Sequence, residues 1–438
     1  MLIVKSPVNI HDYSKEMATK VLRLQTPLFY APLKNSLDLV CGAGEITFTR
    51  STAATYQDRY GILRWVDVDQ PRFDQFGLLI EGESVNRIYP SEDLNNSNWL
   101  KYNCSIETST TITLPDGTSG TNCGIIADTS LNRHHVRICV TSSETTITGS
   151  VFLKKGNKSY AMLEIAFREE DYTFIKDCYG RINLETGELF GLNSMSNVSM
   201  EMEIKECAYD WYRVIIKATY SGSITVGKIS LEIFSCISDG GTIYTGDGNS
   251  VEIYAWGAQL EEKPFATSYI PTTTASVTRN ADVCYVTYNG NVPNIINGNF
   301  SMACDFDCLG DSIYTVSNRH LLTTNLFYTP KYNALYLRKS TNYLRYLRGA
   351  TSTNYVISYP IDTKRRICVT VSSDNIISVY ENGVLKVTDT KSIYSSDISS
   401  NIKIGIGCDD AGTGQLYGHI SNLRIYDFAL TEEEIKLL

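Results

Sequence analysis

The sequence has little of what marks a membrane protein or a nucleic-acid-binding protein. No apolar run approaches the roughly 20 residues that span a bilayer, and the N-terminus lacks the long apolar stretch and small-residue cleavage site of a secretory signal. Basic residues are outnumbered, with 39 Lys and Arg against 48 Asp and Glu and a net charge of -9. Binding along a phosphate backbone needs clustered Lys and Arg. We therefore expect neither membrane insertion nor nucleic-acid binding.

The cysteines lack the spacing of a metal site or a disulfide framework. The 12 cysteines are scattered without a C-x-x-C pair, and the five histidines do not complete a zinc site. Such cysteines indicate free thiols, buried as small apolar side chains in a protein made in a reducing cytosol.

β-forming residues, in contrast, are abundant. The length of 438 residues suggests two or three domains at roughly 150 residues each. The chain contains 29 Tyr but only 7 Met, and it is rich in Thr, Ser, Asn and Ile. β-branched and aromatic residues suit pleated sheets, while Asn, Gly and Ser suit turns. Composition alone favours an all-β protein.

Local patterns agree with this prediction. Residues 200–205 alternate between apolar and charged side chains, as a half-buried strand does. Asn382-Gly383 is the strongest hairpin turn in the chain, and Thr431-x-x-Glu434 predicts a capping box that opens a short C-terminal helix. Many short strands with no long helical period between them are typical of β-sandwiches and jelly rolls.

Breaks in the pattern divide the chain into three parts. Residues 1–33 contain a predicted short helix that Pro27 and Pro32 end, but they are too few to hold a core, so we expect an anchoring segment that packs on another domain or on a partner. Residues 34–279 are predicted to form a leader plus a jelly roll, and residues 280–438 a second jelly roll. The expected fold is all-β, with two β-sandwich domains in tandem after the anchoring segment.

Two stretches carry a resemblance to bacteriophage virion proteins. Residues 48–56 read FTRSTAATY, residues 71–74 read PRFD and residues 77–86 read GLLIEGESVN. They resemble a leader that precedes a carbohydrate-binding-module-like jelly roll in many phage virion proteins. Residues 254–261, YAWGAQLE, and 265–272, FATSYIPT, are similar to the closing strand and exit of that module. The resemblance covers about residues 45–280.

A third stretch is similar to laminin-G-like, concanavalin-A-type jelly rolls. Residues 418–435 read GHISNLRIYDFALTEEEI, like the last strand and helix of that family. The hairpin at residues 380–383 fits the same family. This resemblance covers about residues 285–438.

Together the resemblances imply a structural component of a phage particle that displays glycan-binding-type domains for adhesion to the host. It would be a head fibre, a capsid decoration protein or a tail appendage at the virion surface, made in the bacterial cytoplasm. Residues 1–33 would bind other virion proteins of the capsid or tail, a host cell-surface glycan would be the ligand, and a homo-oligomer is expected. Two other functions stay open: a purely structural stabilising or connector protein without ligand, and a glycan depolymerase.

Aromatic residues near turns are the first candidates for sugar binding, because a sugar ring has an apolar face and a polar rim. Trp65 and Trp99 lie near turns and are predicted to be exposed, although Trp99 could instead plug the end of the sandwich. Trp211 and Trp256 lie within predicted internal strands and are interpreted as core residues.

A second candidate surface lies in the C-terminal unit. Tyr336, Tyr343 and Tyr346 alternate with Arg338, Arg345 and Arg348 and are followed by Tyr355. Tyrosines with arginines could bind an acidic glycan, with Arg reading its carboxylates. The same pattern also fits an ordinary sandwich strand or a protein interface.

Metal binding and catalysis have weaker support. Calcium is a candidate cofactor, with Asp305, Asp307, Asp409 and Asp410 as candidate oxygen ligands, but no stretch forms a complete calcium loop and solvated turns are the favoured interpretation of these residues. Adjacent carboxylates at 169–171 and 261–262 would point to opposite faces of a strand. Neither a nucleophile motif nor a P-loop occurs. We expect no enzyme.

Overall fold

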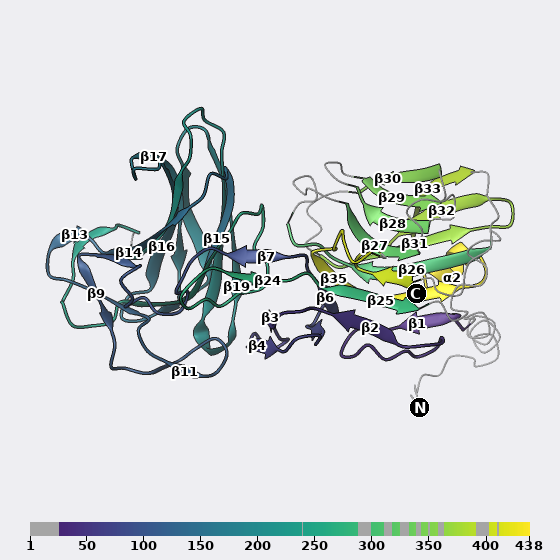
Figure 1. Cartoon of the computed structure of the whole chain (residues 1–438), viewed down its shortest axis with the longest axis horizontal. Helices are drawn as coiled ribbons and strands as arrows, with labels where there is room; N and C mark the ends of the chain where they lie inside the picture. The colour runs from purple at the N-terminus through teal and green to yellow at the C-terminus, as the bar shows by residue number, and fades with distance from the viewer. Residues whose placement is uncertain are drawn as a thin grey trace, which may run out of the picture.

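The computed structural model describes residues 26–238, 240–287, 299–310, 318–324, 333–338, 343–348, 351–357, 363–390, 403–409 and 411–438. Two β-sandwiches lie side by side in it (Figure 1). This architecture confirms the all-β prediction with two sandwiches. Most of the expected anchoring segment, including its predicted helix, lies outside the described residues.

The first sandwich consists of two facing six-stranded sheets. One sheet has the order β19 (Val198–Glu206), β20 (Tyr212–Tyr220), β15 (Thr146–Lys155), β23 (Ile253–Glu261), β12 (Gly124–Ala127) and β9 (Cys104–Glu107). The other has the order β18 (Glu188–Ser194), β17 (Phe174–Asn183), β16 (Tyr160–Arg168), β21 (Lys228–Cys236), β14 (His135–Thr141) and β8 (Leu100–Tyr102). Alternate residues such as Leu163 and Leu231 fill the core between the sheets. A 3-10 turn, η1 (Ala208–Asp210), precedes β20.

The second sandwich pairs an eight-stranded sheet with a seven-stranded one. The larger has the order β33 (Val384–Thr390), β32 (Ile376–Glu381), β31 (Arg365–Val371), β26 (Phe300–Phe306), β35 (Gly418–Tyr426), β6 (Leu78–Ile80) and β5 (Arg72–Phe73), with β1 (Phe29–Ala31) also on β35. The smaller has the order β2 (Ile46–Thr49), β25 (Val283–Thr287), β34 (Lys403–Ile406), β27 (Arg319–Thr324), β28 (Asn333–Leu337), β29 (Tyr343–Arg348) and β30 (Thr351–Val356).

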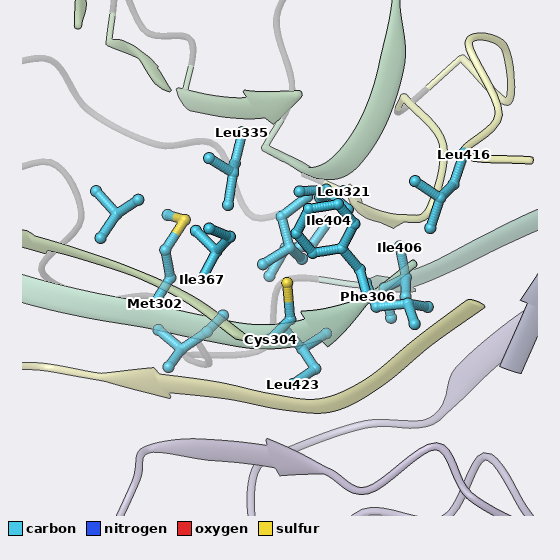
Figure 2. Packing of buried hydrophobic residues seen from close by; sticks show 14 of the residues in the cluster. Met302, Cys304, Phe306, Leu321, Leu335, Ile367, Ile404, Ile406, Leu416 and Leu423 are labelled. Atoms are coloured by element: carbon cyan, nitrogen blue, oxygen red, sulfur yellow. The ribbon is translucent and has the colours of Figure 1, made fainter. Parts of the chain in front are cut away.

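The core of the second sandwich forms between these sheets, where Figure 2 shows Met302, Cys304 and Phe306 among side chains of the facing sheet. The outer side of β26 packs against the C-terminal helix α2 (Glu432–Ile435), whose Ile435 is buried. The predicted capping box is confirmed, since Thr431 and Glu434 cap each other reciprocally.

Strand pairing corrects the expected domain boundaries at 33/34 and 279/280. Strands β1, β2, β5 and β6, all before residue 81, belong to the second sandwich. Phe29, Phe48, Leu78 and Ile80 contribute to its core. The physical reason is that these short strands bury enough apolar surface only by joining the sheets of β25 and β35. The first sandwich is therefore inserted into the second, not placed before it.

Short ladders complete the structure. β7 (Ser84–Asn86) pairs antiparallel with β24 (Val277–Arg279), and Figure 1 shows both between the sandwiches. The other ladders join β3 (Ala54–Gln57) to β4 (Leu63–Val66), β10 (Ile112–Thr113) to β11 (Ser119–Gly120), and β13 (Leu131–Arg133) to β22 (Ile243–Thr245).

A buried ion network, formed by Arg50, Arg72, Glu81, Arg279 and Asp282, lies where the insertion leaves and returns. Arg50 Nη1 lies 3.0 Å from Asp282 Oδ1, Arg72 Nη1 lies 2.6 Å from Glu81 Oε2, and Arg72 also binds Asp282. Arg279 Nη2 lies 3.4 Å from Glu81 Oε2. Burial alone would raise the pKa of Glu81, but Arg279 and Arg72 hold it well below its usual value.

Candidate functional site

Only one of the two candidate tryptophans is exposed. Trp65 on β4 is 50% exposed. Trp99 is 1% exposed, and its Nε1 donates to the carbonyl of Pro90 at 2.9 Å. The prediction that Trp99 is exposed is therefore wrong: its indole packs in the core of the first sandwich because a backbone acceptor satisfies its N–H. Trp211 and Trp256 are buried, as their core interpretation requires.

Two tyrosines of the predicted Tyr/Arg surface, Tyr336 and Tyr346, are buried. The pairing of Leu335 with Tyr346 turns Tyr346 into the core, and Tyr336, on the other face, is buried against His320. Tyr343 and Arg345 are half-buried, and Arg345 Nε donates to Asn354 Oδ1 at 2.7 Å. The expected surface of exposed tyrosines is corrected, because period two sends alternate residues to opposite faces.

The described candidate calcium ligands all have protein partners. Asp305 accepts from Arg366 Nε and Asn422 Nδ2, each at 2.7 Å. Asp307 accepts from the backbone and Nδ1 of His419 at 2.9 and 2.8 Å. Asp409 accepts from Thr413, and Asp410 lies outside the described residues. Within the described part of the chain, no three acidic, His or Cys side chains converge as metal ligands. Calcium binding stays a prediction.

A cleft of about 650 Å³ opens at one end of the first sandwich. Its lining includes Arg87, Ser142, Glu169, Glu170 and Glu262. These groups pair with protein: Glu262 contacts Arg87 at 2.5 Å and Ser142 at 2.7 Å, and Glu170 contacts Lys228 at 3.0 Å. Because these side chains already pair with one another, the cleft offers few polar groups to a ligand.

A different surface combines rings, charges and unsatisfied polar atoms. On β14, β16 and β21, residues that alternate with the core residues point away from the sandwich. Outside their own sheet, the strands of this sheet contact mainly the facing sheet. We call this surface the Glu164 face and define it by Tyr102, His135, Arg137, Glu164, Arg168, Glu232 and Phe234.

Strand register brings the members of this face together. Tyr102 lies opposite His135, and His135 opposite Phe234. In the neighbouring row, Glu232 on β21 lies between Arg137 on β14 and Glu164 on β16. Cross-strand neighbours have Cβ atoms roughly 5 Å apart. Residues separated by nearly 100 positions therefore form one continuous surface.

One row is aromatic. The rings of Tyr102 and His135 stack with centroids 4.4 Å apart, and those of His135 and Phe234 with centroids 4.3 Å apart. Burial lowers the pKa of His135 to about 4, so its ring is neutral at physiological pH. Arg137 lies over the Tyr102 ring and donates to its hydroxyl. Tyr102 and His135 of this row are half-buried beside a fixed cation, and Phe234 is buried behind them.

The other row contains two carboxyl groups that lie in different environments. Glu232 is 4% exposed and accepts from Arg168 Nη2 and Ser230 Oγ, each at 2.9 Å. Glu164 is 8% exposed and accepts no hydrogen bond from a described residue. Burial, together with Glu232 and Asp177, raises the pKa of Glu164 to about 8. Glu164 is thus mainly protonated at neutral pH, and in this form its carboxyl group can both donate and accept hydrogen bonds.

Two polar atoms of this face lack protein partners. His135 Nδ1 and Arg137 Nε are buried without a hydrogen bond. A buried polar atom left unsatisfied costs roughly 1–3 kcal/mol, so two such atoms on one face indicate that a ligand or solvent completes them.

Sequence reasoning missed this site. Neither Glu164 nor Glu232 belongs to a recognisable motif. The available signal was a charged residue within each of two otherwise apolar strands, AMLEIAF and ISLEIF. Because charged residues are rarely buried without a partner, these two positions mark a face with a special role.

Comparison with known proteins identifies the fold of the C-terminal region. Residues 319–436 match the laminin G model of the concanavalin A-like lectin/glucanases superfamily. This agrees with the resemblance noted in the sequence of the second unit. No curated protein sequence matches the chain at a significant level.

Several solved structures are similar over about a third of the chain. The CBM40 of Ruminococcus gnavus IT-sialidase, bound to α2,3-sialyllactose, has 10% identity and TM-score 0.29, and covers 35% of this chain and 91% of its own. The SAP-like pentraxin of Limulus polyphemus has 16% identity, TM-score 0.25 and coverages of 32% and 69%. The binding domain of botulinum neurotoxin DC, in complex with rat synaptotagmin II, has 14% identity, TM-score 0.27 and coverages of 36% and 39%. Likeness at this level carries no argument about function.

The helix content of the described residues is small, and none of their helices is long and apolar enough to cross a membrane.

Proposed function

We propose that the chain is an adhesion protein that binds glycans through the Glu164 face. The observation that supports this is the meeting of stacked rings and unsatisfied polar atoms on the outward side of one sheet, where Tyr102 and His135 are half-buried and Phe234 is buried. Small-molecule sites combine apolar surface with a few placed polar groups. A sugar ring offers both counterparts, an apolar C–H face and a rim of hydroxyls. The ring row would contact the first, and Arg137 and Glu164 the second.

We further propose that this adhesion protein is displayed on a bacteriophage particle. The support is the sequence resemblance of residues 48–86 and 254–272 to phage virion proteins. In this proposal residues 1–33 bind capsid or tail proteins, and a homo-oligomer made in the bacterial cytoplasm presents several sites at the virion surface. Several weak sites on one particle raise avidity through effective concentration.

Binding without hydrolysis is the favoured chemistry. A glycosidase needs one carboxylic acid and one carboxylate free to act on the sugar. Glu232 accepts hydrogen bonds from Arg168 and Ser230 through Oε1, and it is almost fully buried. A buried carboxyl group that already accepts two hydrogen bonds is better suited to position neighbouring side chains than to attack a sugar as a nucleophile.

The test uses the full chain and an immobilised panel of bacterial surface polysaccharides, each before and after periodate oxidation of its diols. We expect binding that periodate abolishes. Tyr102→Ala should weaken it by about tenfold, the equivalent of one lost contact of roughly 1.4 kcal/mol. Trp65→Ala is the matched control, since it removes an exposed ring from the second sandwich's leader and should leave binding unchanged.

The opposite pattern would redirect the proposal. Sensitivity to Trp65→Ala but not to Tyr102→Ala would move the site to the β3–β4 hairpin. Absence of binding to every polysaccharide, even by the multimerised chain, would favour the purely structural role, in which another virion chain covers the Glu164 face.

A further inference from the structure

We propose that Glu164 is the residue by which this face selects its ligand, and that it binds an uncharged, hydroxyl-bearing sugar while it holds its proton. This inference rests on the proposed function, because it assumes that the Glu164 face binds a glycan. It adds the class of sugar and the pH range of binding.

The position of Glu164 is the first support. Its neighbours across the sheet are Glu232 on β21 and Tyr179 on β17. It is more than nine-tenths buried, yet no described residue donates to its carboxyl group. A buried polar side chain of this kind is normally satisfied within the protein. The carboxyl group lies on the outward side of the sheet, near His135 Nδ1 and Arg137 Nε, which are buried without a hydrogen bond.

The surrounding charges determine which form of Glu164 the ligand meets. Glu232 faces it from β21 and Asp177 from β17, while Arg168 on β16 and Arg133 on β13 act in the opposite sense. His135 and Arg137 lie beyond Glu232 on β14. Arg168 already pairs with Glu232, so it neutralises Glu164 only in part. Burial and the two acidic neighbours prevail, and Glu164 keeps its proton at neutral pH.

The same charges restrict the ligand. A sugar carboxylate placed on Glu164 would lie beside Glu232 and Asp177, at a cost in repulsion and desolvation. A protonated carboxyl group donates one hydrogen bond and accepts others. It therefore pairs with sugar hydroxyls, which also donate and accept. An uncharged sugar meets these requirements without bringing a new charge into the site.

Binding should depend on pH in a defined direction. A sugar that covers the face removes the remaining solvent from Glu164, which disfavours its ionised form further. Bound Glu164 therefore holds its proton more tightly than free Glu164. Affinity should be constant below neutrality and fall as the pH rises through about 8. One pH unit above that value, the protonated fraction, and with it the affinity, is about tenfold lower.

The experiment measures affinity of the full chain for the polysaccharides of the panel between pH 5.5 and 9.5. Wild type should prefer uncharged polysaccharides over uronate-bearing and amine-bearing ones and bind about tenfold more weakly at pH 9 than at pH 7. Glu164→Gln resembles the protonated form in shape and charge, so it should keep affinity at pH 6 and lose the dependence on pH. Glu203→Gln is the control: Glu203 is an exposed glutamate on β19 of the facing sheet, and its loss should change nothing.

The outcomes separate this inference from the proposed function. Preference for uronate-bearing or amine-bearing polysaccharides would overturn the inference but leave glycan binding in place. The same holds if wild type binds equally from pH 6 to 9, or if Glu164→Gln shows the wild-type pH profile. No binding to any polysaccharide would overturn both. Circular dichroism of each variant verifies that it is folded.

Discussion

Replacing Glu164 by glutamine should make the chain more stable at neutral pH. In the unfolded chain Glu164 ionises with a pKa near its ordinary 4.5, but in the folded chain burial and its acidic neighbours raise the pKa to about 8. Between these values the unfolded state gains an ionisation that the folded state lacks. Each pH unit of this interval costs about 1.4 kcal/mol, so the free energy of unfolding at pH 7 is lower by roughly 3 kcal/mol because of this side chain. Glutamine, which cannot ionise, removes that cost.

The assay is urea unfolding at pH 4, 5.5, 7 and 8.5, followed by tryptophan fluorescence. Three of the four tryptophans (Trp99, Trp211 and Trp256) are buried in or against the first sandwich and report on its unfolding. Wild type and Glu164→Gln should be similar at pH 4 and diverge progressively up to about pH 8. The exposed Glu203→Gln should track wild type within about 0.5 kcal/mol at each pH. A constant difference between wild type and Glu164→Gln over this range would refute the reasoning, since Glu164 would then ionise as an ordinary glutamate.

Three further predictions concern the second sandwich. Asp282→Asn leaves Arg50 and Arg72 buried without their shared carboxylate, so it should lower the free energy of unfolding by about 3–5 kcal/mol in urea titrations. The control Glu432→Gln, which removes a surface ion pair, should lower it by at most about 0.5 kcal/mol. Equal effects of the two substitutions would contradict a stabilising role of the network. Burial would lower the pKa of His419, but hydrogen bonds to Asp307 and Asp74 raise it to about 9, so its contribution, roughly 3 kcal/mol, is complete below pH 6.5 and lost as pH rises through 9. His419→Gln should therefore destabilise most at pH 6 and least at pH 10 in denaturant titrations, and an unchanged difference would oppose this assignment. A fragment of residues 280–438 lacks β1, β2, β5 and β6 and should not show cooperative unfolding. A chain in which a short linker joins residues 84 and 279 should keep a second sandwich that unfolds cooperatively. A stable 280–438 fragment would instead support two domains that follow each other in the sequence.

The fold class was predictable because it depends on local signals. Alternation at residues 200–205, the Asn382-Gly383 turn and the Thr431 capping box each describe fewer than ten consecutive residues, and the structure contains the strand, the hairpin and the helix that they predict. Short-range patterns of this kind survive in the folded chain because tertiary packing has no reason to override them.

The insertion could not be predicted, because it depends on pairing between distant segments. Phe29 lies opposite Ile425, and Leu78 opposite Ile420. Nothing in residues 29–31 or 78–80 states that their partners on β35 lie more than 300 positions later. Sequence order instead assigns the leader to the domain that follows it, which is the boundary that the strand pairing corrects.

Side-chain burial depended on register, which the sequence leaves open. Tyr336 and Tyr346 differ by an even number of positions yet lie on different strands, and the register of β28 with β29 places Tyr346 toward the core. A one-residue shift of register would move every side chain of a strand to the opposite face of the sheet. The Glu164 face was missed for the same reason: it exists only once three strands are aligned.

The ion network explains why the two phage-like stretches at residues 48–86 and 254–272 accompany each other. The first contributes Arg50, Arg72 and Glu81, and just beyond the second lie Arg279 and Asp282. The second stretch itself supplies Ser268, whose backbone N–H donates to Glu81 Oε1 at 2.8 Å. An inserted domain needs its two ends close together, and the antiparallel pairing of β7 with β24 provides this. These residues therefore fix how the first sandwich is held by the second, whereas the Glu164 face lies on strands outside both stretches. In the proposed function, variation on that face would change the ligand without disturbing the attachment of the first sandwich to the second.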